Sequence, residues 1–156
     1  MAGLSHKDDL LETHPWLIKK IESETGLTLN FDACATKENK KCDDYYCEQD
    51  DVLRNTLLIY DGKGHPKIIF CNPPRSINGK FVNKISEEWK KHNLDIVMLL
   101  TWNDLGNKYG EKLLPHILAR RIKVKNLGKI KFYKNGKETK FPSRLTYLYA
   151  WFKSKH

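Results

Sequence analysis

The chain has 156 residues, with 28 Lys and Arg against 19 Asp and Glu, a net charge of +9 and an apolar content of 40%. This length favours one hydrophobic core, so we expect a single domain over residues 1–156, with residues 1–12 flexible and residues 120–156 forming a basic antiparallel end. Its apolar stretches fall far short of the ~20 residues of a membrane helix and its first residues lack a secretory pattern, so membrane spans and secretion are not expected.

The first third of the chain predicts one helix and one strand. Pro15 favours a helix start, Thr13 is a candidate cap, and Gly26 ends a helix that runs to residue 25. Residues 27–32 alternate between apolar and polar and predict a strand that ends on an acid. Residues 36–51 are polar without a clean period, which predicts an ordered loop or short helical turns.

The middle of the chain alternates between strands and helices. Residues 57–60 and 67–71 are apolar and flank a glycine-rich turn, so both are predicted strands. Residues 79–92 place their apolar side chains on one helical face. Residues 95–101 form a continuous apolar run typical of a buried parallel strand, and residues 109–118 predict a short helix interrupted or ended at its proline.

The last part of the chain predicts antiparallel strands in place of alternating helices and strands. Residues 129–134 and 137–140 flank Asn135-Gly136, a strong signal for a tight hairpin, and residues 144–152 alternate like a final strand. Helix and strand alternation followed by an antiparallel end predicts an α/β fold with a mixed sheet, helices on both faces and an antiparallel C-terminal hairpin.

Positive charge is concentrated in the last 52 residues. The chain up to Asp104 holds 14 basic and 17 acidic residues, a net of −3, whereas the remainder holds 14 against 2, a net of +12. This segregation favours a surface for a polyanion, with nucleic acid the leading partner and a solvated basic hairpin the alternative. The candidate nucleic-acid-binding residues are Arg120, Arg121, Lys123, Lys125, Lys129, Lys131, Lys134 and Lys137.

The four cysteines do not have the spacing of a metal site. Cys34, Cys42, Cys47 and Cys71 include no C-x-x-C pair and no histidine at zinc-finger spacing. We therefore expect reduced thiols, no metal and no disulfide framework.

Asn72-Pro73-Pro74 is the segment with the strongest chemical signal. It follows a predicted buried strand directly, and in an open α/β sheet this position lies at the carboxyl edge, where ligands bind. Two successive prolines fix the local backbone, so the Asn72 amide and the nearby carbonyls are held in place. Such a fixed set of acceptors suits an exocyclic amine, which presents two hydrogens.

The strand followed by Asn-Pro-Pro resembles the catalytic motif of amino-methyltransferases that use S-adenosylmethionine. The order of Thr13-His-Pro, the Asp32-Ala-Cys-Ala-Thr stretch with its following Glu-Asn and Cys42, Asp50-Asp51 and Asn72-Pro-Pro is similar to the phage-type DNA N6-adenine methyltransferase (Dam) family. The resemblance covers residues 13–152. It implies a single Rossmann-like, S-adenosylmethionine-dependent methyltransferase domain that acts on the N6 amino group of adenine in DNA.

The resemblance also implies roles for individual residues. Asn72 and the Pro73 carbonyl would accept hydrogen bonds from the adenine amine, with Pro74 and Arg75 completing the catalytic segment. The implied cofactor-binding residues are Asp32, Ala33, Cys34, Ala35, Asp50, Asp51 and Asn72. The target base would leave its stack while the basic tail holds the DNA backbone.

Arg75 departs from the family pattern, which has an aromatic residue after the two prolines. A guanidinium plane can stack on a base, or the change can mark an altered substrate or lost activity, and Trp102 or Tyr109 could supply an aromatic wall instead. The alternatives are a catalytically silent nucleic-acid-binding module, methylation of cytosine N4 or of an RNA amine, and a small-molecule methyltransferase. We expect DNA as partner, with RNA as the alternative, a monomer or homodimer, and a cytoplasmic location, or the host-cell cytoplasm for a virus-encoded protein.

Overall fold

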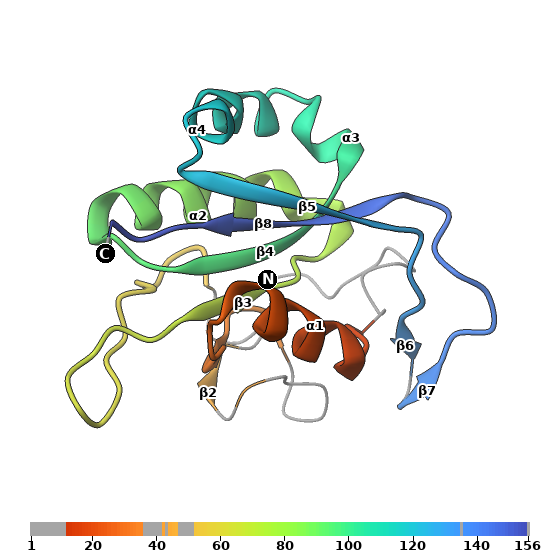
Figure 1. Ribbon diagram of the computed structural model, residues 1–156, viewed down its shortest axis with the longest axis horizontal. Coiled ribbons are helices and arrows are strands. Elements are labelled where there is room, and N and C mark those ends of the chain that lie inside the picture. The colour runs from red at the N-terminus through yellow and green to blue at the C-terminus, as the bar shows by residue number, and fades with distance from the viewer. Residues whose placement is uncertain (1–11, 36–41, 43, 47–51, 135, 156) are drawn as a thin grey trace.

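A six-stranded mixed sheet forms the centre of the computed structural model, which describes residues 12–35, 42, 44–46, 52–134 and 136–155 (Figure 1). The strands in spatial order are β2 (Asp44–Tyr45), β1 (Phe31–Asp32), β3 (Ile69–Cys71), β4 (Ile96–Thr101), β8 (Tyr147–Phe152) and β5 (Ile122–Gly128). The first four strands are parallel, and β8 is antiparallel to both of its neighbours. The fold is therefore mixed α/β with an antiparallel end, as predicted.

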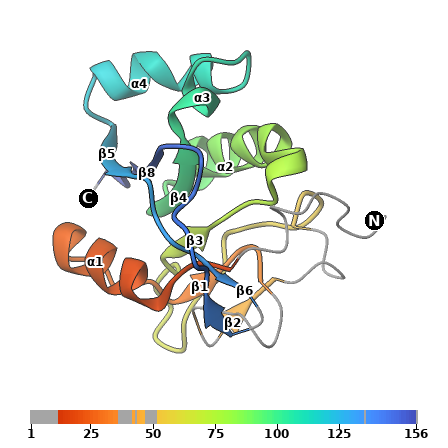
Figure 2. The same cartoon turned by 90° about the vertical axis from the view of Figure 1, so that its right-hand side faces the viewer.

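Helices cover both faces of the sheet (Figure 2). The helix α1 (Pro15–Thr25) lies on one face and α2 (Asn78–His92) on the other. The shorter helices α3 (Trp102–Leu105) and α4 (Leu114–Leu118) and the 3-10 turns η3 (Arg75–Ile77) and η4 (Gly110–Leu113) complete the chain between β3 and β5.

The buried strands β4 and β8 divide the core between the two faces of the sheet. In β4, Met98 packs in the same apolar cluster as α2, whereas Val97 and Leu99 pack in the cluster that contains α1. The same alternation holds in β8, where Ala150 faces the α2 side and Tyr149 the α1 side. Successive strand residues point to opposite faces, and both faces are covered, so the continuous apolar runs of these strands are buried throughout.

The predicted hairpin is present beside the N-terminal end of α1, but its strands are shorter than predicted and form a two-stranded sheet separate from the main one. The strands β6 (Tyr133–Lys134) and β7 (Lys137–Glu138) pair in antiparallel fashion, and Asn135 of the turn lies outside the described residues. Glu12 forms an isolated bridge with Tyr133, with backbone N to O distances of 2.7 and 2.8 Å. Most of the segment predicted to be flexible, residues 1–11, is also outside the described residues, but its last residue is tied to the hairpin.

Several local predictions differ from the structure. The helix over residues 15–25 has the predicted bounds, but its N-cap is His14, whose Nδ1 accepts from the backbone N of Trp16 at 3.1 Å, and not Thr13. Within residues 27–32 only β1 is a strand, because Leu29 N donates to the carboxylate of Glu22 and the Asn30 side chain accepts from Ile68 N. Side chains thus take hydrogen bonds that a longer strand ladder would have used.

Other differences concern two edge strands, one predicted strand and one proline. β2 lies within the segment predicted as a loop, residues 57–60 form no strand beyond an isolated bridge between Tyr60 and Pro66, and Pro115 lies in the first turn of α4 without ending it. The edge strand β5 was not predicted, because its lysines alternate with apolar residues inside a continuous basic stretch and conceal the strand period.

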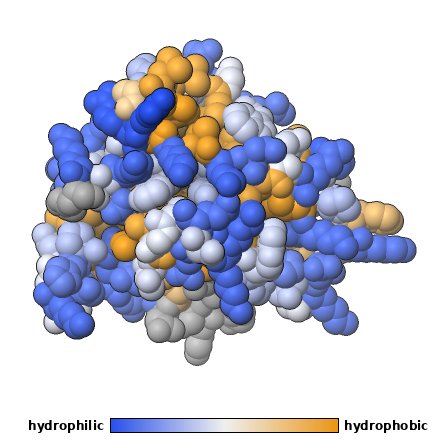
Figure 3. Space-filling model, viewed as in Figure 1, coloured by the Kyte–Doolittle hydropathy of each residue, from blue (hydrophilic) through white to orange (hydrophobic). Residues whose placement is uncertain are grey.

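Apolar side chains gather on the surface over α4, at the top of Figure 3. Leu114 is 42% exposed and Leu118 is 83% exposed. None of the described helices has the length and apolar character needed to span a membrane.

Candidate functional site at the carboxyl edge of the sheet

The strand order changes direction between β1 and β3. From this point the sheet extends through β2 on one side and through β4 on the other. Connections leave in opposite directions at such a switch point, and this opens a crevice at the carboxyl ends of the strands, where ligands of open α/β sheets bind. Asp32 ends β1 and Asn72 follows directly on β3, so both predicted site residues lie at this crevice.

Asn72 is held by a side chain from the start of the chain. Its Nδ2 donates to Oγ1 of Thr13 at 2.8 Å, across 59 positions of sequence. Thr13 is buried, with 4% of its surface exposed, and Asn72 is half-buried. Within the described part of the chain, no residue donates a hydrogen bond to Oδ1 of Asn72. The amide therefore has an occupied donor side and an open acceptor side.

The two prolines that follow Asn72 make the backbone rigid next to this amide. Pro73 and Pro74 are both buried, and Pro74 has φ −57° and ψ 133°, an extended conformation that proline favours. The Pro74 carbonyl accepts from Ile77 N at 3.2 Å as the chain enters η3. The backbone around Asn72 is consequently fixed by ring geometry, burial and a turn.

Arg75 makes a two-pronged ion pair with Asp104 of α3. Its Nη1 lies 2.7 Å from Asp104 Oδ2 and its Nη2 lies 3.2 Å from Oδ1. The Asp104 side chain is 5% exposed and that of Arg75 is 19% exposed. The guanidinium edge is thus used to fasten the Asn-Pro-Pro segment to the end of β4, a contact that the sequence prediction of a base-stacking or phosphate-binding arginine did not include.

Asp104 is the centre of a tightly packed corner. Burial opposes ionisation of its carboxyl group, but hydrogen bonds from Arg75 and from the backbone N of Thr101, at 2.7 Å, outweigh this and lower its pKa. A Cβ at Gly110 would lie 1.8 Å from the Asp104 carbonyl oxygen, so only glycine fits there. A Cβ at Gly79 would likewise lie 2.4 Å from the ring of Tyr109.

These contacts also place the two candidate aromatic residues. Tyr109 packs on α2 through Gly79, whereas Trp102 is 40% exposed and its Nε1 donates to Asn126 of β5 at 2.8 Å. Trp102 therefore leans toward the β5 side of the sheet, away from β3.

The Asp32 segment lies next to the Asn72 segment. Asp32 pairs with Phe70 in the register of β1 and β3, and Ala33 N donates to the Phe70 carbonyl at 2.8 Å. The Asp32 carboxyl group is buried, with the residue 3% exposed, and its Oδ1 accepts from Cys34 N at 3.1 Å. Ala35 N donates to the Tyr46 carbonyl at 2.9 Å. The structure thus places residues 32–35 of the predicted cofactor set beside Asn72, whereas Asp50 and Asp51 lie outside the described residues.

The cysteines of this region are packing residues. Burial raises the pKa of the fully enclosed Cys71 thiol well above its usual value, and the neighbouring Cys34 and Asp32 add to this effect. A protonated thiol is a weak nucleophile, so Cys71 serves as a small apolar residue at the end of β3.

The eight predicted nucleic-acid-binding residues fall into two groups. Arg120, Arg121 and Lys123 lie at the start of β5, which runs parallel to β4, so they are at the amino edge of the sheet, opposite Asn72. Lys125, farther along β5, is ion-paired with Glu24 of α1 at 2.7 Å. The second group follows β5 and occupies the hairpin region at the carboxyl edge: Lys129, Lys131, Lys134 and Lys137.

Two residues of the site were not assigned a site role from the sequence. Thr13 was considered as a helix cap and as part of the Thr-His-Pro motif, and its contact with Asn72 joins segments too distant for any local pattern to indicate. Asp104 had a usable signal, because Thr101 to Asp104 has the spacing of a capping box directly after a buried strand. The spacing of the capping box does not indicate that Arg75 is the ion-pair partner of Asp104.

The chain is similar to a known protein family over most of its length. The family model described as "DNA N-6-adenine-methyltransferase (Dam)" matches residues 3–143. A protein of Escherichia phage T1 named "DNA N-6-adenine-methyltransferase" is 34% identical over 92 residues, which cover 59% of this chain and 35% of the phage protein. The aligned part thus spans about a third of that relative's length. With the family model matched over most of its length, the chain belongs to the DNA N-6-adenine-methyltransferase (Dam) family.

Proposed function

We propose that this protein is an S-adenosylmethionine-dependent methyltransferase of Rossmann-like fold that acts on the N6 amino group of adenine in DNA. The observation that carries the proposal is the Asn72 amide, with its nitrogen bound to Thr13 and its oxygen open at the switch-point crevice. Family membership and the name of the phage T1 relative support the same reaction.

The residues at the end of β1 fit the proposed cofactor. S-adenosylmethionine carries an ammonium group and ribose hydroxyls, which are donors that a carboxylate accepts well. Asp32 supplies a buried carboxyl group at the crevice, and the turn from Ala33 to Ala35 is fixed by the backbone hydrogen bonds described above. When bound, the cofactor supplies an electrophilic methyl group. Asp50 and Asp51 remain candidates for its ribose or adenine.

The chain's own contribution to the reaction is to hold and orient the target amine. Oδ1 of Asn72 and the Pro73 carbonyl accept the two amine hydrogens, which raises electron density on the nitrogen and aims it at the methyl group. The rigid prolines keep both acceptors in place, so little reorganisation is needed as charge develops. These two acceptors recognise only the amine, so other contacts must recognise the rest of the base.

A direct assay tests the proposed function. The purified protein is incubated with unmethylated DNA and S-adenosylmethionine labelled in its methyl group, and digested nucleosides are separated by mass spectrometry. We expect label in N6-methyladenine. Label in N4-methylcytosine, or label in RNA supplied in place of DNA, would change the assigned substrate. Absence of methyl transfer, with DNA binding that depends on salt but not on the cofactor, would support the catalytically silent binding module instead.

The hairpin region is proposed to hold the DNA. Lys129, Lys131 and Lys134 lie at the carboxyl edge with the site, and of these Lys131 has a long contact of 3.4 Å with Glu138 that leaves both side chains nearly half exposed. Changing these three lysines to glutamine is expected to weaken DNA binding about tenfold or more and to lower the slope of log affinity against log salt by roughly 3, as each lost phosphate contact lowers it by about 1.

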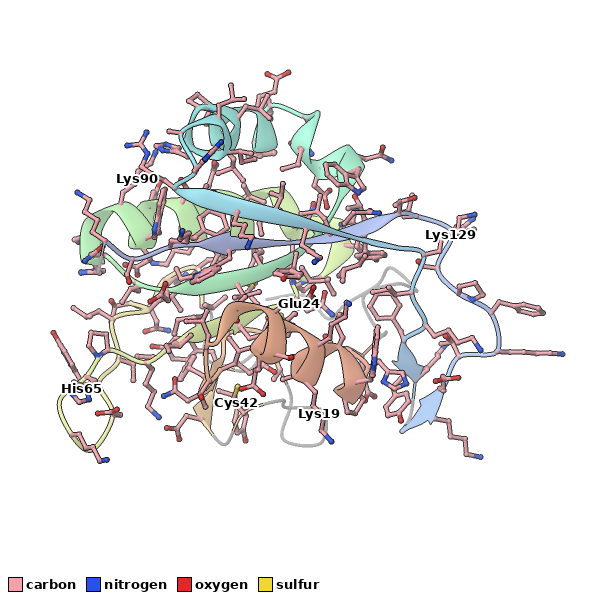
Figure 4. All side chains as sticks on the ribbon, in the orientation of Figure 1. Lys19, Glu24, Cys42, His65, Lys90 and Lys129 are labelled. Atoms are coloured by element: carbon pink, nitrogen blue, oxygen red, sulfur yellow. The ribbon has the colours of Figure 1, made fainter. Side chains whose placement is uncertain are left out.

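The control for this prediction changes three exposed lysines at a distance. Lys63, Lys90 and Lys91 lie in the loop before β3 and at the end of α2, and Figure 4 shows Lys90 and Lys129 on opposite sides of the molecule. Both triple variants have the same net charge, so a loss specific to the hairpin variant, measured by fluorescence anisotropy, identifies the contact surface. Cofactor affinity should be the same in both. Equal losses of DNA affinity in the two triple variants would contradict a DNA-binding surface on the hairpin region. A loss of cofactor affinity in the hairpin variant would indicate that these lysines have a structural role.

A further inference from the structure

We propose that Thr13 is a positioning residue that keeps the Asn72 amide turned with its oxygen toward the substrate amine. The inference rests on the proposed function, and it extends the site to a residue that would not touch substrate in this role. Its physical basis is the contact from Asn72 Nδ2 to Thr13 Oγ1 at 2.8 Å.

The amide of an asparagine has two faces of opposite hydrogen-bonding character. Rotation about its last side-chain torsion is broad and roughly two-fold, so backbone rigidity alone does not choose between them. With Oδ1 outward the amide accepts from an amine, and with Nδ2 outward it presents hydrogens to hydrogens. Only the first orientation serves the reaction, so the residue that fixes Nδ2 inward also sets the fraction of competent enzyme.

Burial makes Thr13 effective in this task. Thr13 is 4% exposed, so its hydroxyl is shielded from competing water, whereas Asn72 is half-buried. An inward Oδ1 would require the hydroxyl to donate instead and would leave the two Nδ2 hydrogens facing the substrate. In the structure the hydroxyl oxygen accepts from Nδ2, which holds the donor side of the amide and keeps the acceptor side available.

Thr13 is itself fixed by its two neighbours. The backbone of Glu12 is paired with Tyr133 of β6. The ring of His14 lies 4.6 Å from that of Tyr133, and its Nε2 lies 2.8 Å from Oε2 of Glu138 in β7. Because Nδ1 of His14 accepts from the N-terminus of α1, Nε2 carries the hydrogen donated to Glu138. The hairpin and the helix thus hold the threonine on either side.

The test compares Thr13→Val and Thr13→Ser. Valine keeps the branched shape and removes the hydroxyl, whereas serine keeps the hydroxyl. We expect Thr13→Val to lower kcat for methyl transfer about tenfold, the cost of one lost orienting hydrogen bond, while Thr13→Ser stays within about threefold of the parent. KM for DNA, the cofactor Kd from calorimetry and the thermal midpoint should change little in both variants, because the acceptor itself and the packing remain.

A double variant separates positioning from other roles. In an Asn72→Ala background there is no amide to orient, so Thr13→Val should cost less than about twofold there. The same tenfold loss in both backgrounds would overturn the proposal. A parallel loss of cofactor affinity in Thr13→Val would also overturn it, because Thr13 would then act on the cofactor.

A readout without activity keeps this proposal distinct from the proposed function. The side-chain amide resonance of Asn72, assigned by its disappearance in Asn72→Ala, should exchange its hydrogens slowly in the parent and in Thr13→Ser, and faster in Thr13→Val. Unchanged exchange in Thr13→Val would refute the positioning role. An inactive parent protein that still shows the exchange difference would refute the methyltransferase function and leave the Thr13 contact established.

Discussion

Replacement of Asn72 by alanine is expected to lower the rate of methyl transfer by about 10² to 10³-fold, the usual effect of removing one group that stabilises developing charge. The change deletes the acceptor at the carboxyl end of β3 and leaves the backbone segment unchanged. Asn72 is half-buried and its side chain has one partner, Thr13, among the described residues, so the fold should tolerate the loss. Single-turnover kinetics with labelled cofactor measures the chemical step directly.

The matched control is Asn103→Ala. Asn103 is an exposed asparagine in α3, and its substitution should leave the rate within about twofold of the parent, as surface changes away from a site usually do. Cofactor affinity measured by calorimetry should survive in both variants if Asp32 and its turn provide most of that binding. A rate for Asn72→Ala close to that of the control would remove Asn72 from the catalytic group.

Loss of the Asp104 carboxyl group should have the largest effect on stability. Asp104→Ala removes the buried carboxylate that binds the mostly buried Arg75 guanidinium and accepts from Thr101 N, so we expect a drop of about 3 kcal/mol in the free energy of unfolding, measured with urea. The exposed Glu87→Ala serves as the control and should change stability by less than about 0.5 kcal/mol.

A companion variant identifies the reason for that loss. Replacing both partners, as in Arg75→Met with Asp104→Leu, removes the buried positive charge together with its carboxylate and should recover at least about half of the lost stability. If the double variant is as unstable as Asp104→Ala, packing around Gly110 rather than the ion pair accounts for the effect.

The same pair makes stability depend on pH in a defined direction. The pKa of Asp104 is lowered in the folded protein, so its stabilisation is present above the ordinary Asp pKa of about 3.9 and is lost as pH falls through the folded value. The difference in unfolding free energy between the parent and Asp104→Asn should therefore be largest near neutral pH and shrink below about pH 4. A difference that is constant down to acidic pH would contradict this assignment.

The elements that the sequence predicted well are those with a strong local signal. The helix from Pro15 has a proline start and a glycine end, and α2 has a clear apolar face. β4 has a continuous apolar run, and β8 lies in a segment predicted as a strand from its alternation. β2 and β5 lack such runs, because an edge strand buries little and its lysines conceal the alternation. Their places follow from pairing with a neighbour rather than from their own residues.

Local sequence signals likewise indicated some features of the candidate site and not others. The positions of Asn72 and Asp32 were predictable because Asp32 ends β1 and Asn72 follows β3, and strand ends meet at one edge of a parallel sheet. The contacts from Thr13 to Asn72 and from Arg75 to Asp104 were not, because each depends on side chains brought together from distant segments. The base-stacking interpretation of Arg75 considered the chemistry of a free guanidinium, and the structure gives that group a nearby buried carboxylate.

The place of β8 has a consequence for how the protein is made. This strand is the last along the chain, yet it lies between β4 and β5 and pairs with both over their length. During synthesis, at about 5–20 residues per second, one edge of β4 and the whole of the lysine-bearing β5 stay unpaired until β8 is made, because β4 has β3 as its other neighbour. A chain that stops before Tyr147 would therefore leave β4 with an open edge and β5 without its partner strand, and it would be prone to aggregation rather than merely shortened.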